Sequence, residues 1–440
     1  MAASAVVAGL GKTGQSVIRH LGARGWEVAG TDSRAEPPGF AMLCAVYPRL
    51  RFAVGGLDTK LLDGADCVVA SPGLSLADPF FAAARARGIE VIGDIELFAR
   101  SGARPVVGIT GTNGKSTVTT LVARMAEHAG VAARAGGNLG PPALDLLEGQ
   151  PAKLYVLELS SYQLETTQSL ELGAATVLNV TPDHMDRYTG MAAYAAAKAR
   201  IFRHCGAAVI NLDDPQVAAM ARAGQRTLTF SIEGRPADYH LSVESGGEWL
   251  CCRGERLMAM DEMHLVGRHN AANALAALAM GEALGLDRFA MLTALAGFPG
   301  LPHRAAFVRD LAGVRYVNDS KGTNVGATLA AVAGFTGPLL LIAGGDGKGQ
   351  DFTSLATALA GKTRLVLLIG RDAPAIEAAL AGQVPTERCA TLEDAVVAAA
   401  RAARPGDTVL LSPACASLDM FRDYAQRGEV FADAVRRLAA

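Results

Sequence analysis

A glycine-rich loop set between an apolar run and a helical pattern is the feature that most restricts how this 440-residue chain can fold. The loop is GTNGKST at 111–117; it follows PVVGIT and precedes TTLVARMAEH. In a strand–loop–helix unit of this kind, backbone N–H groups, the positive helix N-terminus and a lysine converge on phosphate oxygens. The sequence therefore predicts an α/β domain that binds a nucleotide phosphate through Lys115, with Ser116 as a Mg²⁺ ligand.

The loop departs from the general phosphate-loop pattern at one position. G-x-x-x-x-G-K-[ST] requires glycine at position 109, where this chain has Ile109, so the loop fits a shorter G-T-N-G-K-S form. A glycine turn with an exposed lysine is the competing interpretation, and it is the weaker one because the flanking strand and helix patterns match a phosphate site.

Short β-type runs alternate with helical patterns along the whole chain, which predicts parallel sheets in three α/β domains. The segment GFPGLPHR concentrates glycine and proline and favours a linker. We expect a Rossmann-like N-terminal domain, a central P-loop ATPase-like domain with a mostly parallel sheet, and a C-terminal Rossmann-like α/β domain. Their predicted bounds are 1–94, 95–298 and 299–440.

The bulk composition excludes several classes of protein. Half of the residues are hydrophobic and 19% are charged, which is typical of soluble globular chains. The net charge of -2 indicates neither a nucleic-acid partner nor an anionic membrane. No apolar run approaches the roughly 20 residues of a membrane span, and no signal peptide is visible, so a cytoplasmic location is expected. Seven cysteines without a C-x-x-C pair indicate core residues in a reducing compartment.

A second glycine turn lies near the N-terminus. Gly9-x-Gly11-x-x-Gly14 follows a β-type run, and Asp32 ends the next run, as in the dinucleotide fingerprint. Three interpretations remain open: a nicotinamide site, a site for the diphosphate of another nucleotide conjugate, and a structural turn. The stronger phosphate loop at 111–117 weakens the nicotinamide interpretation.

Acidic, imidazole and amino groups follow the phosphate loop. Glu158 ends the run LYVLEL, at the sheet edge where open α/β folds build their sites, and is a candidate Mg²⁺ ligand. His184 follows the run TVLNV and is a candidate metal ligand or substrate-orienting group. Spacing alone favours a surface position for Lys198, because it sits in the alanine-rich helical pattern AAYAAAKARIF.

Taken together, the motifs resemble the Mur ligases over essentially the whole chain. They occur in the family's order: GTNGKST, LELSSYQL, NVTPDHMDRY, AAKARIF, GRHNAANALAA, LPHR, VNDSKGTN, GGDGKG and SPACASLDMF. The resemblance implies an ATP-dependent amide ligase of peptidoglycan synthesis that activates a carboxylate as an acyl phosphate. It is nearest to members that add D-glutamate to UDP-N-acetylmuramoyl-L-alanine. It also implies two Mg²⁺ ions, a monomer, and no nucleic-acid or membrane partner.

The resemblance also implies roles for individual residues. Lys115, Ser116 and Glu158 would hold ATP phosphates and the first Mg²⁺, and a carbamylated Lys198 would hold a second Mg²⁺ with His184. This role overturns the surface interpretation of that lysine. The residues implied for ATP are Gly111, Thr112, Asn113, Gly114, Lys115, Ser116, Thr117, Asn270, Asn273, Arg304 and Asp319.

The resemblance implies a further set of residues that bind the UDP-linked substrate and the amino acid. The residues implied for them are Gly11, Lys12, Thr13, Gly14, Ser33, Arg34, Ser71, Pro72, Gly73, Asn138, Gln163, Lys321, Thr323, Lys348, Ser417 and Tyr424. Lys348 and Ser417 would bind the side-chain carboxylate of glutamate. Tyr424 departs from the phenylalanine of a familiar member, so the ring is retained and a hydroxyl is added. Lys321 and Lys348 also fit ordinary surface positions in glycine-rich loops.

Other functions remain to be weighed against this one. A ligase of the same family that uses L-alanine, L-lysine, diaminopimelate or a folate substrate is the nearest alternative; SPACASLDMF favours D-glutamate, but the stereochemistry of the amino acid cannot be read from it. A nicotinamide-dependent oxidoreductase would use the first domain alone. A P-loop switch protein is disfavoured because no N-K-x-D motif occurs.

Overall fold

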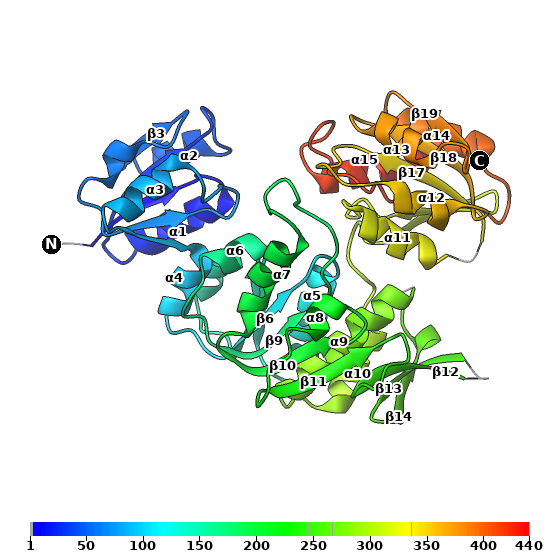
Figure 1. Ribbon diagram of the computed structural model, residues 1–440, viewed down its shortest axis with the longest axis horizontal. Coiled ribbons are helices and arrows are strands. Elements are labelled where there is room, and N and C mark those ends of the chain that lie inside the picture. Colours follow the sequence, from blue (N-terminus) through cyan, green and yellow to red (C-terminus); the bar gives the residue numbers. More distant parts are fainter. Residues whose placement is uncertain (1–2, 245–246, 266, 336, 440) are drawn as a thin grey trace.

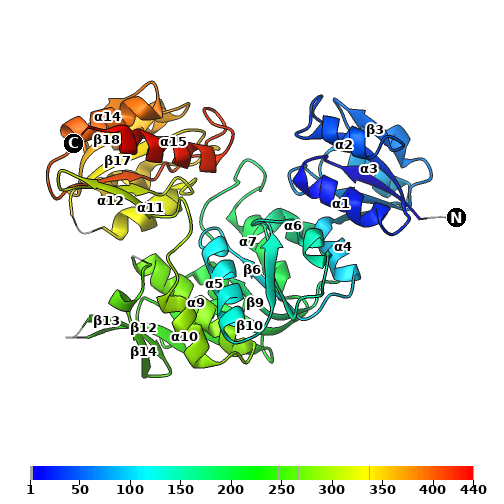
Figure 2. The same cartoon turned by 180° about the vertical axis from the view of Figure 1, so that it is seen from behind.

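The structure is a computed structural model that describes residues 3–244, 247–265, 267–335 and 337–439. It contains three α/β domains, each built on its own sheet. The first and third domains stand apart from each other on the same side of the central domain (Figure 1). The view from behind shows the same arrangement (Figure 2). The expected α/β class with mostly parallel sheets is confirmed, whereas the boundaries after residues 94 and 298 stay predictions.

The first domain is a five-stranded parallel sheet in the order β3-β2-β1-β4-β5. Its strands are β1 (Ser4–Ala8), β2 (Glu27–Asp32), β3 (Arg51–Val54), β4 (Cys67–Ala70) and β5 (Glu90–Gly93). Its helices are α1 (Lys12–Gly22), α2 (Phe40–Val46), the 3₁₀ turn η1 (Thr59–Leu62) and α3 (Pro79–Ala86). The strand order reverses between β1 and β4, and the loops after these two strands leave the same carboxyl edge, where such sheets bind ligands.

The central domain has nine strands in the order β14-β13-β12-β11-β10-β9-β6-β8-β7. The strands from β12 to β7 are parallel, and β13 and β14 extend the sheet antiparallel. The strands are β6 (Val106–Thr110), β7 (Ala133–Gly137), β8 (Leu154–Glu158), β9 (Leu172–Val177), β10 (Cys205–Asn211), β11 (Arg226–Ser231), β12 (Tyr239–Glu244), β13 (Gly247–Cys252) and β14 (Glu255–Ala259).

Helices cover both faces of this sheet. They are α4 (Asp94–Arg100), α5 (Lys115–His128), η2 (Ala143–Leu147), α6 (Ser161–Glu165), α7 (Met191–Ala199), η3 (Arg200–Phe202), α8 (Pro215–Ala218), η4 (Met260–Glu262), α9 (Arg268–Ala283) and α10 (Arg288–Ala296). Helix α9 is buried from Ala274 to Gly281 without a polar face, because α5, α10 and the sheet enclose it.

The third domain has six strands in the order β15-β16-β20-β17-β18-β19, parallel except for β15. The strands are β15 (Ala306–Leu311), β16 (Val314–Asn318), β17 (Leu339–Gly344), β18 (Thr363–Ile369), β19 (Thr386–Arg388) and β20 (Thr408–Leu411). The helices are α11 (Val325–Ala333), α12 (Thr353–Leu359), α13 (Ala373–Leu380), α14 (Leu392–Ala402) and α15 (Tyr424–Arg437). The predicted linker lies between α10 and β15 and is neither helix nor strand.

The apolar cores differ in how they join the domains. One buried cluster runs from Val17 and Ile18 of the first domain through Ile95 and Phe98 of α4 into the central domain, around Leu157. The third domain has two clusters of its own, one on each face of its sheet. We infer that the first two domains share a continuous core, whereas polar contacts join the third domain to the central one.

Two expectations from composition have different outcomes. Cys67, Cys251, Cys252 and Cys415 are buried core residues, but Cys44, Cys205 and Cys389 are only partly buried, so the prediction of seven core cysteines was wrong for three. Cys44 lies on α2, Cys205 begins β10 and Cys389 follows β19; Cys205 and Cys389 pack against the edge of a core cluster, which cysteine's small size tolerates. Within the described ranges no helix combines the length and hydropathy needed to cross a membrane.

Candidate active site

The phosphate loop joins β6 to α5, and its shape depends on Gly114. This glycine has φ +85°, and a Cβ added to it would lie 2.3 Å from Asn273 Oδ1 on α9. Only glycine combines that backbone conformation with so close a neighbour. Ile109, which breaks the general pattern, lies inside β6 and is fully buried in the central core. The loop is short because the strand continues to Thr110.

Two lysines point at the same loop carbonyl. Lys115 Nζ donates to Gly111 O at 2.9 Å and to Thr112 O at 2.8 Å, and Lys198 Nζ donates to Gly111 O at 2.8 Å. Lys198 is 1% exposed and lies 4.5 Å from the Tyr194 ring centroid, so the surface position indicated by its helical spacing is wrong. Burial lowers the pKa of both lysines, and their mutual repulsion adds to the effect at Lys198.

Glu158 ends β8 beside the loop and carries an unsatisfied oxygen. Its Oε1 accepts a hydrogen bond from Asn138 Nδ2 at 2.6 Å. Its Oε2 is buried and has no hydrogen-bond partner within the part of the chain that the structure describes. A buried carboxylate oxygen without a donor is costly, and a hard cation is one partner that would satisfy it.

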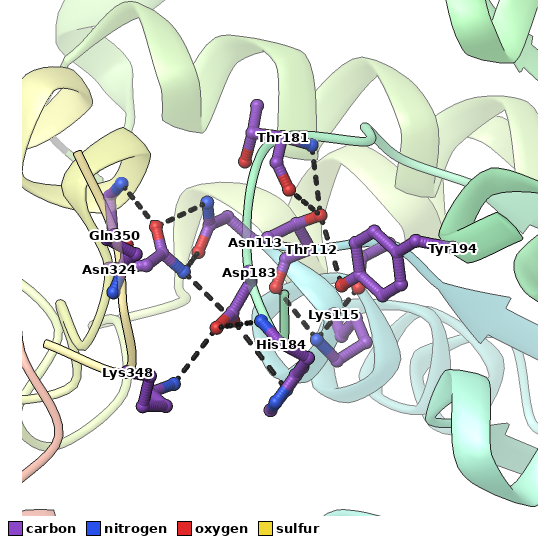
Figure 3. Close-up of polar contacts among 12 residues, drawn as sticks. Thr112, Asn113, Lys115, Thr181, Asp183, His184, Tyr194, Asn324, Lys348 and Gln350 are labelled. Atoms are coloured by element: carbon purple, nitrogen blue, oxygen red, sulfur yellow. Dashed lines mark hydrogen bonds and ion pairs between the residues drawn. The ribbon is translucent and has the colours of Figure 1, made fainter. Parts of the chain in front are cut away.

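The segment between β9 and α7 carries the next two groups, as Figure 3 shows. Asp183 is buried and accepts from Lys348 Nζ at 2.9 Å. Burial raises the pKa of Asp183, but the charges of Lys348, His184 and Lys115 and the Lys348 hydrogen bond together hold the net value below the ordinary range. His184 has φ +58°, and its Nε2 lies 3.7 Å from Asp183 Oδ2. Burial lowers the pKa of His184, which favours the neutral ring that metals bind.

The third domain contacts the phosphate loop through Asn324 and Arg304, and it contacts Asp183 beside the loop through Lys348. Asn324 Nδ2 donates to Asn113 Oδ1 at 3.2 Å and to Asp183 Oδ2 at 3.3 Å (Figure 3). Arg304 Nη2 donates to Ser116 Oγ at 2.7 Å. Arg304 and Lys348 therefore place two positive charges near the phosphate loop.

A cavity of about 280 Å³ opens between the loop, α9 and the third domain. Its walls combine apolar side chains with a few polar groups, as ligand pockets do. The lining includes Asn113, Gly114, Thr117, Leu178, Phe230, Leu265, Asn270, Asn273, Arg304, Asp319 and Lys321. Asp319 is held by Ser412 Oγ at 2.7 Å, and burial raises the pKa of Asp319 to about 6. The cavity has the character of a site for the nucleoside part of a nucleotide.

The residues expected to bind the amino acid lie on loops of the third domain. An isolated β-bridge between Asp346 and Ala416 joins the loop of Lys348 to that of Ser417. Tyr424 begins α15, and Lys321 Nζ lies 3.8 Å from its ring centroid. Burial, followed by the charge of Arg304, lowers the pKa of Lys321 to about 7. Thr323 adjoins this lysine, with its amide donating to Lys321 O at 2.8 Å.

The residues expected to bind a nucleotide conjugate gather at the carboxyl edge of the first sheet. The turn at 11–14 begins α1, and a Cβ on Gly14 would overlap Gly9 O at 1.8 Å. Asp32 is buried and accepts from Leu10 N at 2.7 Å and from Arg34 Nη2 at 2.8 Å. Its carboxylate is thereby tied to the turn and to Arg34, which disfavours the ribose-binding role it has in nicotinamide enzymes.

The expected residues thus form two groups. The phosphate-loop residues, Glu158, His184 and Lys198 gather with the third-domain residues around the central loop. Residues 11–14, 33–34 and 71–73 form a second group on the first domain. Asn138 and Gln163 lie on the central domain between them: Asn138 binds Glu158, and Gln163 Nε2 donates to Asp94 Oδ2 at 3.1 Å.

Sequence reasoning missed several residues that build the site. Asn179 Oδ1 accepts from Asn113 N at 2.8 Å and so fixes the phosphate loop. Asp183 and Asn324 were also overlooked as bridges to the third domain. Asn179 lies near the end of the run TVLNV and Asp183 adjoins His184, so the position of polar groups at a strand's carboxyl end would have found both.

Asp94 supplies a pH-dependent prediction. Burial raises its pKa from 3.8 to about 6. The folded state therefore holds this proton more tightly than the unfolded chain does, and the stabilisation is complete below pH 3.8 and lost as the pH rises through 6. Asp94→Asn stays neutral at both pH values. We expect its free energy of unfolding, relative to that of the wild type, to rise by roughly 2 kcal/mol from pH 4.5 to pH 8. Urea unfolding of the variant and the wild type at pH 4.5 and pH 8 measures the change. A difference in stability between the two proteins that is the same at both pH values contradicts the prediction. Asp261→Asn, at an exposed position, is the control.

Family models match the chain in the order of its domains. A Mur ligase MurD-like N-terminal domain matches residues 3–93, a Mur ligase middle domain matches 109–281, and a Mur ligase glutamate ligase domain matches 303–415. A UDP-N-acetylmuramoylalanine–D-glutamate ligase of Nitrosococcus oceani is 52% identical over 100% of this chain and 97% of its own length. The chain belongs to the Mur ligase family. As a member, it is an ATP-dependent ligase.

Other Mur ligases extend the comparison. The D-glutamate ligase of Methylococcus capsulatus is 52% identical over 99% of this chain and 95% of its own. The structure of UDP-N-acetylmuramate-alanine ligase from Thermotoga maritima has a TM-score of 0.63 at 18% identity, with 98% of this chain and 99% of that chain covered. The MurF ligase of Thermotoga maritima in complex with ADP has a TM-score of 0.62 at 19% identity, covering 86% and 91%. These two structures show the shared Mur ligase fold.

Proposed function

We propose that this Mur ligase joins D-glutamate to the alanyl carboxylate of UDP-N-acetylmuramoyl-L-alanine and converts ATP to ADP and phosphate. The observation that carries the proposal is the 52% identity to D-glutamate ligases over the whole chain. The polar and charged groups converging on the phosphate loop from the central and third domains support it. The first-domain group would bind the UDP part through the turn at 11–14, Ser33-Arg34 and residues 71–73.

ATP fits the space between the central and third domains. The nucleoside would occupy the 280 Å³ cavity, with Asn270 and Asn273 facing the base and Asp319 facing the ribose. The phosphates would lie along residues 111–117, where the N-terminus of α5 points its free N–H groups. Lys115 and Arg304 would then exchange their loop and Ser116 contacts for phosphate oxygens.

The residues present fit a magnesium ion bound together with phosphates. No cluster of three or more His, Cys, Asp or Glu side chains suited to a metal occurs among the described residues. Mg²⁺ needs no such cluster, because it binds through one or two carboxylates, waters and substrate phosphates. Glu158 Oε2 is the unsatisfied buried atom that would bind such an ion, and Ser116 would be its second protein ligand. When bound, the ion would neutralise the charge of the transferring phosphoryl group.

We propose that Lys198 is carbamylated and, with His184, holds a second magnesium ion. Carbamylation joins the amine nitrogen to the carbon of carbon dioxide and releases a proton, so it requires a neutral amine. The buried position of Lys198 beside Lys115 favours that neutral form. Both Lys198 and His184 contact the Tyr194 ring, at 4.5 Å and 6.4 Å, which places them around one side chain.

The reaction needs activation because a carboxylate resists attack by an amine. An oxygen of the alanyl carboxylate would attack the γ-phosphorus of ATP, and ADP would leave. Lys115 would stabilise the charge on the transferring oxygens. The neutral amine of D-glutamate would then attack the carbonyl carbon, phosphate would leave with the electron pair of the C–O bond, and the proton lost by the amine would pass to solvent. His184 acts here as a metal ligand rather than as the base, because its ring cannot easily serve both roles.

The amino acid would bind to the third-domain loops. Lys348 Nζ has three donors, and within the described part of the chain one of them is used, on Asp183, which leaves two for the side-chain carboxylate of glutamate. Ser417 lies on the adjoining loop and would add a hydroxyl donor. Thr323 and Tyr424 would complete the site, with the tyrosine ring taking the packing role of a phenylalanine.

Lys348→Met is expected to raise the KM for D-glutamate by about 30-fold or more, since one charge-assisted contact of this kind contributes roughly 2 kcal/mol or more. The KM for ATP should change less than threefold, because the side-chain contact of Lys348 seen among the described residues goes to Asp183, which does not line the cavity. Steady-state kinetics with each substrate varied in turn measures both. Equal effects on the two KM values contradict the assignment.

The proposed function is tested with purified protein, ATP, Mg²⁺ and UDP-N-acetylmuramoyl-L-alanine. Phosphate release and product mass are compared across D-glutamate, L-glutamate, L-alanine, L-lysine and diaminopimelate. D-glutamate should be the preferred acceptor; preference for another amino acid overturns the assignment within the family. We further propose that the enzyme acts as a cytoplasmic monomer, which sedimentation of the purified protein and cell fractionation test.

A further inference from the structure

Residues 181–190, called here the bridging loop, connect β9 to α7 and are bonded on both sides. On one side, Asp183 binds Lys348 and Asn324 of the third domain. On the other, Arg187 Nη1 donates to Pro72 O of the first domain at 3.1 Å. The ribbon of the loop rises from the central domain between the other two (Figures 1 and 2).

The guanidinium of Arg187 is held on several sides. Its Nη2 donates to Glu165 Oε2 at 3.2 Å, and its central carbon lies 3.8 Å from the Tyr162 ring centroid. Glu165 is itself fixed, because Tyr188 Oη donates to its Oε1 at 2.6 Å. The Arg187 side chain is only 16% exposed. A planar guanidinium that forms an ion pair, stacks on an aromatic ring and donates a hydrogen bond to a carbonyl at the same time has little freedom to move.

The group at the far end of this contact is also rigid. Ser71 N donates to Ala8 O at 2.8 Å, and Ser71 Oγ donates to Gly9 O at 2.9 Å. Pro72 is therefore fixed to the glycine turn of the first domain. At the near end, the amide of Arg187 donates to His184 O at 3.0 Å, and the Tyr162 ring lies 5.0 Å from the His184 ring. Arg187 therefore connects the glycine turn of the first domain to the backbone of His184.

We propose that Arg187 is a positioning residue that fixes the spacing between the nucleotide-conjugate site of the first domain and the reaction centre. The inference rests on the proposed function, in which one long substrate binds both places at once. With its UDP end held on the first domain, the substrate brings its carboxylate to the phosphate loop only if this spacing is correct. Misplacement by about 1 Å lowers rates by roughly a hundredfold.

The experiment separates the two ends of the substrate. Arg187→Ala, Arg187→Lys and Glu165→Gln are compared with the wild type, and Arg203→Ala removes an exposed arginine of the same domain as the control. Calorimetry gives the affinity for UDP alone and for UDP-N-acetylmuramoyl-L-alanine, and kinetics gives kcat. Arg187→Ala should bind UDP as the wild type does, bind the complete precursor about tenfold more weakly, and lose between ten- and a hundredfold in kcat.

The two conservative variants test whether the geometry and the ion pair of Arg187 both matter. Arg187→Lys retains the charge but not the planar guanidinium, and Glu165→Gln removes the opposite charge while keeping an acceptor, so both should show smaller losses in the same direction. The proposal is overturned if Arg187→Ala keeps kcat and precursor affinity within twofold, or if UDP and precursor affinities fall equally. Failure of the wild type itself to bind the precursor would instead reject the proposed function.

Discussion

Lys115→Ala is expected to lower the rate of phosphate release by about a thousandfold, because it removes the one cation of residues 111–117, placed where charge develops during phosphoryl transfer. Loss of a single preorganised donor in such a site costs a factor of roughly 10² to 10³, and the full charge of a lysine puts the effect at the upper end. Lys115 Nζ already lies inside the loop, bound to Gly111 O and Thr112 O. The alanine variant should lose kcat at saturating ATP.

Lys115→Arg should fail to restore this activity, since a planar guanidinium does not replace a compact ammonium in a loop built around it. Exposed Lys153→Ala on the same domain is the matched control and should behave as the wild type. The thermal unfolding midpoint of Lys115→Ala is compared with that of the wild type, so that a loss of activity is not mistaken for unfolding. An alanine variant that retains a tenth or more of the activity contradicts the role given to this lysine.

Lys198→Ala should lose on the order of a hundredfold in kcat and recover in part when acetate, formate or propionate is added. The loss follows because removal of a group that holds or orients a metal typically costs a factor of ten to a hundred. The rescue follows because the alanine leaves a buried space beside Gly111 O, which a small carboxylate fills with the same charge as a carbamate.

Lys115→Ala under the same additives is the control for Lys198→Ala. A carboxylate cannot replace the missing cation, so no rescue is expected there. Mass spectrometry of the intact wild type, kept near neutral pH with bicarbonate, should show the added mass of one carbamate. A fully active Lys198→Ala variant, or equal rescue of both variants, removes the carbamate from the scheme.

Local patterns allowed the fold class and the position of the phosphate loop to be predicted. The runs that form β1, β4, β6, β8, β17 and β20 are short, apolar and bounded by turns, so they are recognisable without their neighbours. Strands β3, with the sequence RFAV, and β14, with the sequence ERLMA, were missed because each has only three consecutive apolar residues and these are mostly partly exposed. Such strands depend on pairing with a neighbour that the sequence does not reveal.

Contacts between distant segments were beyond sequence reasoning. The helical spacing of Lys198 favours the surface, but Tyr194 and the phosphate loop cover it, and only the fold brings them there. The ion pair of Asp183 with Lys348 spans 165 residues, and the bond from Arg187 to Pro72 spans 115. The sequence around each of these residues gives no indication of which distant residue it contacts. The family resemblance, rather than spacing, supplied the roles of these loops.

Transfer of an ¹⁸O label tests the central claim most directly. The precursor carries ¹⁸O in both oxygens of its alanyl carboxylate and reacts with ATP, Mg²⁺ and D-glutamate. If the phosphate loop hands the γ-phosphoryl group to that carboxylate, each phosphate released carries one ¹⁸O and the new amide keeps the other. Unlabelled phosphate, or label recovered in AMP, would show that the acid is not activated in this way.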